Sequence, residues 1–186
     1  MSDSKPLGRV VVMSGPSGAG KTSVCRELKK HPRVEFSVSA TTRAPREHEV
    51  DGVDYHFLDR EEFERRVEAG EFIEHAEYSG NYYGTLRAPM ERALAEGRVY
   101  VLEIEVQGTK QLRDSGLEAT YIFVAPPSLD EVRRRLVARG TDDAAEIDRR
   151  IEIAARELDA QSRYDHVVVN DDLDATIAQV ERLLWP

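Results

Sequence analysis

The sequence is short of cysteine, of long apolar runs and of positive charge, and each shortage narrows what the protein can be. A single cysteine, Cys25, excludes an internal disulfide framework and fits a reducing compartment. No stretch approaches the roughly twenty consecutive apolar residues that a membrane-spanning helix needs, and residues 1–9 lack the apolar segment of a signal peptide. We therefore expect a soluble, cytoplasmic protein with no membrane partner.

The shortage of positive charge argues against one further class of partner. The chain carries 35 acidic and 26 basic side chains, which gives a formal net charge of -9 at pH 7. An electrostatic field of that sign disfavours broad binding to nucleic acid. It does not exclude a phosphorylated substrate, because a few local cations and backbone amides can hold such a ligand.

One local motif follows directly after the apolar run Val10–Met13. Its eight residues match the phosphate-loop pattern G-x-x-x-x-G-K-[ST] and are Gly15, Pro16, Ser17, Gly18, Ala19, Gly20, Lys21 and Thr22. The glycines let successive N–H groups face a polyphosphate, and the helix expected after them turns its positive dipole end to the same anion. Lys21 is expected to reach the outer phosphates of ATP, and the Thr22 hydroxyl is expected to ligate Mg²⁺.

This motif leaves two questions open. A glycine-rich turn that merely joins a strand to a helix is the structural alternative, although chance matches usually lack the strand before and the helix after. The motif also does not identify an acceptor, since ATPases, GTPases and small-molecule kinases share it. The rest of the chain has to decide between these activities.

Apolar runs and helical patterns alternate along most of the chain. The runs Val10–Met13, Val99–Val106, Tyr121–Val124 and Val167–Val169 are near-continuous, which is typical of strands buried on both faces of a parallel sheet. Helices are predicted after Ser128, over Ile147–Leu158 and over Leu173–Leu184. The pattern predicts an α/β fold with a parallel sheet of the P-loop NTPase type, flanked by helices.

The middle of the chain breaks this alternation. Short strands are predicted over Phe36–Ser39, Tyr55–Phe57 and Phe72–Tyr78, with a hairpin turn at Ser79-Gly80-Asn81 and helices over Asp59–Glu68 and Pro89–Glu96. We expect residues 36–96 to form a small β-rich lobe inserted into a core made of residues 1–35 and 97–186. A lobe on two connections can swing over a ligand bound to the core.

A cluster of anion-binding side chains lies inside this lobe. Arg43 and Arg46 flank a proline that stiffens the backbone, so their planar guanidinium groups can converge on one tetrahedral anion, and Tyr55 adds an uncharged hydroxyl donor. A monophosphate needs such charge-assisted, partly bidentate hydrogen bonds. The alternative is a solvated turn whose arginines pair with Glu47, Glu49 and Asp51, and spacing alone does not choose between the two.

At this segment the sequence resembles the guanylate kinases. The arrangement T-T-R-x-x-R-x-x-E-x-x-G-x-x-Y-x-F from Thr41 to Phe57 is similar to that family's signature. Glu71–Glu74, Ser79–Thr85, Val106-Gln107-Gly108, Arg139-Gly140-Thr141 and Val169–Leu173 follow in the family's order. The resemblance spans Val10 to Leu184.

The resemblance implies a site for GMP in the lobe. Its phosphate would be held by Ser39, Arg43, Arg46, Tyr55 and Tyr83, with Gly84 allowing close backbone approach. Its base would be read by Glu74, Thr85 and Glu105. Guanine agrees with this assignment, because a carboxylate can accept its N1–H and N2–H₂ donors together, whereas adenine would leave that carboxylate unpaired.

The same resemblance implies a helical lid at about residues 138–152 that closes over ATP. Closure would bring Arg139 and Arg150 onto the transferring phosphates, so these two arginines, Lys21 and Arg43 are the expected catalytic residues. Other arginines nearby, Arg133–Arg135 and Arg149, are expected on solvated helix faces. Asn170, after the last core strand, is expected to line the adenine pocket.

One departure from the family lies in the second core strand. Glu103 and Glu105 stand where many relatives have aspartates, and along an extended strand both would project from the same face. The expected reaction is ATP and GMP giving ADP and GDP, with dGMP as a further acceptor. Two alternatives remain: a guanylate-kinase-like module that binds phosphorylated peptides, and a kinase for another nucleoside monophosphate.

Overall fold

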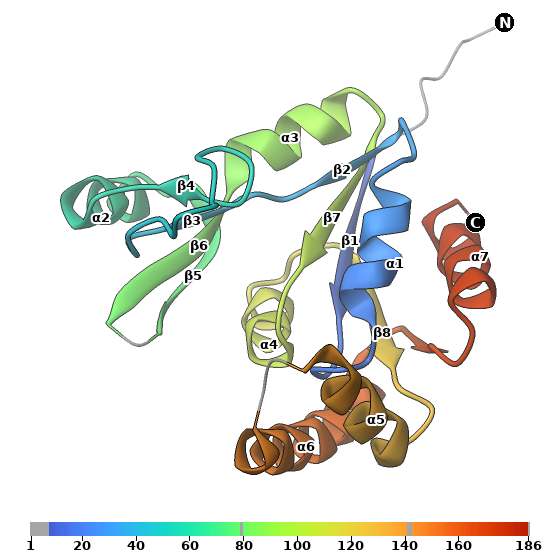
Figure 1. Ribbon diagram of the computed structural model, residues 1–186. Coiled ribbons are helices and arrows are strands. Elements are labelled where there is room, and N and C mark those ends of the chain that lie inside the picture. The colour runs from blue at the N-terminus through green and yellow to red at the C-terminus, as the bar shows by residue number, and fades with distance from the viewer. Residues whose placement is uncertain (1–7, 79, 141–142, 186) are drawn as a thin grey trace, which may run out of the picture.

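The computed structural model describes residues 8–78, 80–140 and 143–185 and contains two sheets (Figure 1). Strands and helices alternate along the core, as the sequence predicts. Among the described residues, every helix is too short or too polar to cross a membrane.

The larger sheet has five strands, all parallel to their neighbours. Their order across the sheet is β2 (Val34–Phe36), β7 (Val99–Glu103), β1 (Arg9–Ser14), β8 (Thr120–Ala125) and β9 (His166–Val169). The central strands are buried on both faces, which explains why their sequences are apolar without alternation.

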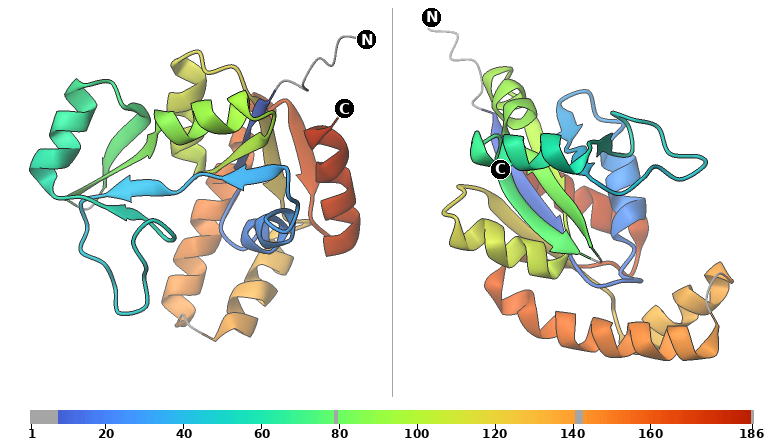
Figure 2. Two further views of the ribbon diagram at one scale, coloured as in Figure 1. Left: turned by 90° about the horizontal axis from the view of Figure 1, so that it is seen from above. Right: turned by 90° about the vertical axis from the view of Figure 1, so that its left-hand side faces the viewer.

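Helices cover both faces of this sheet. Val11 and Met13 pack with α1 (Lys21–Leu28) and α7 (Leu173–Leu184), whereas Val10 and Val12 pack with α3 (Arg87–Ala95) and α4 (Val106–Asp114). The left view in Figure 2 shows α1 on one side of the sheet and α3 and α4 on the other. The phosphate loop therefore lies at the carboxyl end of a central strand, where α/β sheets bind ligands.

Two predicted strands are wrong in part. The run Val99–Val106 is extended only as far as Glu103, because Glu105 is the N-cap of α4 and Val106 is its first residue. The run Phe36–Ser39 is divided, since Phe36 ends the edge strand β2 of the core and Ser39 begins a strand of the other sheet. The core therefore has one strand more than the sequence predicts.

The smaller sheet and its helix, residues 39–86, are called the lobe below. Its strands lie in the order β4 (His56–Phe57), β3 (Ser39–Thr41), β6 (Asn81–Leu86) and β5 (Phe72–Tyr78). One face packs against α2 (Arg60–Glu68) through Ala40, Phe63, Phe72 and Leu86. The predicted β5–β6 hairpin is antiparallel, with Tyr78 paired to Asn81, and Ser79 of its turn lies outside the described residues.

Two helices form the part of the chain predicted to be a lid. Ser128 caps α5 (Leu129–Arg139) by accepting the Glu131 N–H at 3.1 Å, and Gly140 ends it with a φ of 66°. Helix α6 (Ala144–Leu158) packs on α5 and runs into the short 3₁₀ helix η1 (Asp159–Arg163). Of the turn between α5 and α6, Thr141 and Asp142 lie outside the described residues.

Candidate active site

The phosphate loop joins β1 to α1 and has the backbone conformation that its glycines predict. Gly15, Gly18 and Gly20 all have positive φ angles, and a Cβ on Gly15 would lie 2.1 Å from the Val124 carbonyl oxygen. Lys21 Nζ donates to the Gly15 carbonyl at 3.1 Å, so the ammonium group lies across the loop. This arrangement offers backbone N–H groups, a helix N-terminus and one cation to a polyphosphate.

The outer side of the loop is held by two side chains from distant parts of the chain. The Asn170 amide, which is 5% exposed, donates to the Ala19 carbonyl at 2.7 Å. Arg135 donates to the same carbonyl at 3.2 Å, to the Gly18 carbonyl at 3.4 Å and to the Asn170 carbonyl at 2.9 Å. The expectation that Arg135 lies on a solvated helix face is therefore wrong, because its guanidinium binds loop carbonyls instead of water.

The lid helix α6 also contacts the loop. Arg150 donates to the Ser17 hydroxyl. Glu157, two turns further along the same face of α6, lies near Lys21 and the Ser17 N–H. Burial raises the pKa of Glu157, and Lys21 partly offsets that rise. By contrast, Arg139 lies exposed at the C-terminal end of α5. Of the two lid arginines predicted for catalysis, the structure places only Arg150 on the loop.

The lobe carries a row of polar side chains on the face opposite α2. Ser39 of β3 lies opposite Thr85 of β6, and Thr85 lies opposite Glu74 of β5. Tyr83, two residues before Thr85, is on the same face of the sheet. Residues from three strands, which the sequence predicts as parts of one ligand site, are therefore brought together on a single surface.

Glu74 and Thr85 form the innermost pair of this row. The Thr85 hydroxyl is buried and donates to Glu74 Oε1 at 2.7 Å. Burial raises the pKa of Glu74, and the hydrogen bond from Thr85 opposes that rise only in part. The carboxylate is thus held in an environment that disfavours its charge.

The cationic part of the lobe is built around Arg43. Its guanidinium binds both carboxylate oxygens of Glu49, at 2.7 and 2.9 Å, with only 18% and 17% of the two side chains exposed. The rings of Tyr55 and Tyr83 lie edge to face at 6.2 Å, and Arg43 lies 5.5 Å from the centre of the Tyr55 ring. Both hydrogen bonds to Glu49 come from Nη2 of Arg43, while Nη1 donates to the Ala44 carbonyl at 2.7 Å. Arg43 is therefore fixed among aromatic groups by an ion pair and a backbone contact.

Glu49 connects the two arginines that the sequence predicts as a pair. Its Oε2 also accepts the backbone N–H of Arg46 at 2.8 Å, which ties the turn between the arginines to the Arg43 side chain. The alternative with arginine ion pairs is thus partly correct for Arg43 and Glu49. The pair is largely shielded, however, and the Arg46 side chain is exposed and available to an anion.

Gly84, Glu103 at the end of β7 and Glu105 just after it have structural surroundings that the sequence does not predict. A Cβ on Gly84 would lie 2.7 Å from Phe72 Cδ1 and 2.9 Å from the Glu74 carbonyl oxygen, so sheet packing alone requires glycine there. Glu103 lies beside the buried Cys25 thiol, whose pKa is raised by burial and by that carboxylate. Glu105 is exposed at the N-cap of α4.

Sequence reasoning missed Arg135, Glu49 and Glu157 as parts of the site. Arg135 and Gly18 are separated by 117 residues, and no local pattern indicates such a contact. A weak signal exists for Glu49, because it lies between Arg46 and Tyr55, which the sequence predicts as ligands of one anion. Glu157 gives no signal at all among the many charges of α6.

Comparison with known proteins gives a consistent result. A family model described as guanylate kinase matches residues 7–186. A guanylate kinase of Frankia casuarinae is 48% identical over 180 residues, which cover 96% of this chain and 97% of that protein. One of Synechococcus sp. (strain JA-3-3Ab) is 47% identical, with 96% and 83% covered. The crystal structure of guanylate kinase from Anaplasma phagocytophilum has a TM-score of 0.73 and 37% identity, and covers 97% of this chain and 86% of that one.

Proposed function

The chain belongs to the guanylate kinase family, and from this premise we propose that it transfers the γ-phosphoryl group of ATP to GMP, giving ADP and GDP, with dGMP as a further acceptor. The observation that carries the proposal is the polar face of the lobe. It combines a shielded arginine beside the ring of Tyr55 with a largely buried carboxylate next to a threonine hydroxyl. One end suits a phosphate and the other suits a guanine edge.

The donor side is assigned to the phosphate loop and the lid. The loop N–H groups and Lys21 would hold the outer phosphates of ATP, and Arg150 would move from the Ser17 hydroxyl onto the transferring phosphate. Arg139 would join it only after the end of α5 has moved toward the loop. Asn170 is assigned to the adenine side, where it already supports the loop from behind.

The acceptor side is assigned to the lobe. Arg43, Arg46, Ser39, Tyr55 and Tyr83 would bind the GMP phosphate, and Glu74 and Thr85 would bind the base. Further contacts are assigned to Gly84 and Glu105. The acceptor oxygen of GMP is already ionised at neutral pH, so the reaction needs positioning and charge neutralisation and no general base.

Mg²⁺ fits the residues present. Thr22 is exposed at the second position of α1, directly beside Lys21, and its hydroxyl would hold the ion together with the ATP phosphates. The described residues contain no group of three or more His, Cys, Asp or Glu side chains that could hold a metal ion. When bound, Mg²⁺ would neutralise negative charge on the transferring group.

We further propose that the lobe and lid move relative to the core. The bounds expected from the sequence are residues 1–35 and 97–186 for the core, 36–96 for the GMP-binding lobe and about 138–152 for the lid. Of the middle segment, the lobe as defined above, residues 39–86, would move, because Phe36 ends a core strand and α3 packs on the core sheet. Closure would exclude water, which could otherwise accept the phosphoryl group.

The experiment that tests this function compares Arg43→Met with Arg182→Met, a matched change of an exposed arginine on α7. Arg43→Met should lower turnover with GMP at least a hundred-fold in a coupled ADP assay and leave ATP affinity within two-fold of the parent. Arg182→Met should change neither. Equal loss of ATP binding in Arg43→Met would contradict the assignment, and so would faster ADP release with AMP or UMP than with GMP.

A further inference from the structure

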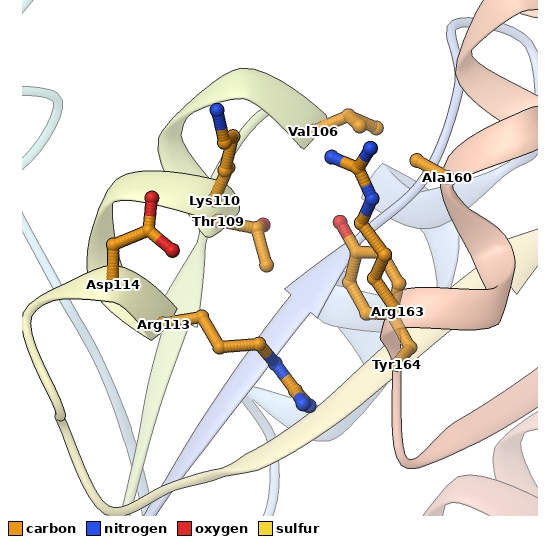
Figure 3. Close-up of a pocket in the computed structure, with 8 residues that line it drawn as sticks. All are labelled: Val106, Thr109, Lys110, Arg113, Asp114, Ala160, Arg163 and Tyr164. Carbon is orange, nitrogen blue, oxygen red and sulfur yellow. The ribbon is translucent and has the colours of Figure 1, made fainter.

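A cavity of about 400 Å³ lies between α4 and the segment from η1 to Tyr164, and the proposed function makes no use of it (Figure 3). Part of its wall is apolar, formed by Val106 and Ala160 and by the stems of longer side chains. The volume is within the range of small-molecule sites. A second cavity of about 320 Å³ shares Val106, Lys110 and Arg163 with it. Its further lining includes Ile153, Arg156 and Glu157, and Glu157 also adjoins the phosphate loop.

The cavity is cationic although the chain as a whole is acidic. Lys110, Arg113 and Arg163 line it, against the single carboxylate of Asp114. Figure 3 shows Lys110 and Arg163 reaching from opposite walls toward the same end of the cavity. Neither of these two side chains forms an ion pair with a described carboxylate, whereas most arginines of the described chain do so.

Arg113 is different, because its charge is already in use. It pairs with Asp165 at 2.8 Å and lies 4.2 Å from the centre of the Tyr121 ring. In Figure 3 its guanidinium points away from the ends of Lys110 and Arg163. The charge available to a ligand therefore comes from Lys110 and Arg163.

An uncharged donor faces the same space. The Tyr164 hydroxyl is shielded from solvent and lacks a hydrogen-bond partner among the described residues. Its ring is fixed edge to face on Phe123 at 4.9 Å, and the hydroxyl points toward Thr109 on α4 (Figure 3). Buried hydroxyl groups without a partner are rare, and a ligand oxygen in this cavity would supply the missing acceptor.

We propose that this cavity binds a small organic phosphate. Lys110 and Arg163 hold its phosphate group, the Tyr164 hydroxyl donates to a phosphate oxygen, and the apolar wall and the second cavity accommodate the organic part. A phosphate fits because two cations and a neutral donor approach from different directions, as a tetrahedral dianion requires. The inference is independent of which nucleoside monophosphate the active site accepts.

The proposal is tested by measuring the binding of phenyl phosphate to the full chain with two-dimensional ¹H–¹⁵N NMR. The active site is first filled with GMP and a non-hydrolysable ATP analogue with Mg²⁺, so that the probe cannot report on the phosphate loop. Phenyl phosphate should then shift amide signals of residues 106–114 and 159–164. Shifts confined to residues 15–22 or to the lobe would overturn the proposal.

Variants complete the test. Lys110→Gln with Arg163→Gln should weaken phenyl phosphate binding at least ten-fold, and Arg163→Gln alone at least three-fold; both side chains are exposed, so folding should be unaffected. Arg182→Gln, on α7, is the matched control and should bind as the parent does. Tyr164→Phe should weaken binding two- to five-fold. Unchanged affinity in the double variant, or inorganic phosphate binding as tightly as phenyl phosphate, would overturn the assignment.

Discussion

Replacing Glu74 by Gln separates the function of this carboxylate from its effect on stability. The side chain keeps its shape and still accepts the Thr85 hydroxyl, which is 2.7 Å away in the parent. It loses the negative charge that would accept the two guanine donors, and it turns an N–H₂ group of its own toward them. The change should therefore damage GMP recognition without disturbing the lobe.

The expected loss follows from hydrogen bonds to a charged group, each of which contributes roughly 1.5–3 kcal/mol. Losing two such bonds, with some compensation by the new amide, should cost about 3 kcal/mol, or roughly a hundred-fold in kcat/KM for GMP. The preference for GMP over AMP should fall by a similar factor. Steady-state kinetics with both acceptors at saturating ATP measures both quantities.

Although Glu74→Gln should damage GMP recognition, it should increase the stability of the fold at neutral pH. Because burial raises the pKa of Glu74 above its ordinary value of 4.5, the folded chain binds this proton more tightly than the unfolded chain does. The stability of the fold therefore falls as pH rises from about 4.5 through the folded pKa, and Gln at this position removes that penalty. Thermal unfolding should show the variant more stable than the parent at pH 7, with a difference that disappears below about pH 4.5.

Glu77→Gln is the matched control, because Glu77 lies on the same strand but is exposed. It should change neither kinetics nor stability. If Glu74→Gln kept kcat/KM for GMP within three-fold of the parent, Glu74 would not read the base. If it were instead less stable than the parent at pH 7, the buried carboxylate would not be a destabilising group.

Three further predictions concern the contacts around the two halves of the site. Arg135→Gln should raise KM for ATP about ten-fold and leave KM for GMP nearly unchanged, whereas Arg134→Gln, on the exposed face of α5, should alter neither constant. Glu49→Gln should raise KM for GMP several-fold, because Arg43 loses its ionised partner, while the exposed Glu47→Gln should have no effect; equal KM values in the two variants would contradict a positioning role. Gly84→Ala should lower the thermal midpoint by several degrees, since its Cβ has no room in the lobe. An unchanged midpoint would show that the lobe can expand there.

The sequence predicts those parts of the fold that local patterns determine. Continuous apolar runs give β1, β8 and β9, and the capping residue Ser128 gives the start of α5. The prediction fails where a short segment depends on its neighbours. The three residues of β2 are too few to show a period, and they form a strand only because β7 is next to them.

The candidate site also has parts that the sequence predicts and parts that it does not. The phosphate loop and Arg43 are recognisable because their spacing along the chain is itself the signal. Arg135 is not recognisable, since its role is created by the fold, which brings α5 against a loop more than a hundred residues earlier. Two neighbouring arginines on one helix therefore have different roles, and only their contacts distinguish Arg135 from Arg134.

The contacts behind the phosphate loop also bear on how ATP is bound. The carbonyl groups of Gly18 and Ala19 turn outward to Arg135, and the Asn170 amide adds a second donor to Ala19. The peptide that turns the Ala19 carbonyl outward turns the Gly20 N–H to the opposite side, where a phosphate would lie, whereas the Ala19 N–H is donated to the Pro16 carbonyl at 3.2 Å and closes the loop internally. Because the Arg135 guanidinium is positively charged, it polarises the peptide groups whose carbonyls it binds and makes their N–H groups stronger donors. The loop is therefore preorganised by α5 and by the residue after β9, and ATP need not supply the free energy for ordering it.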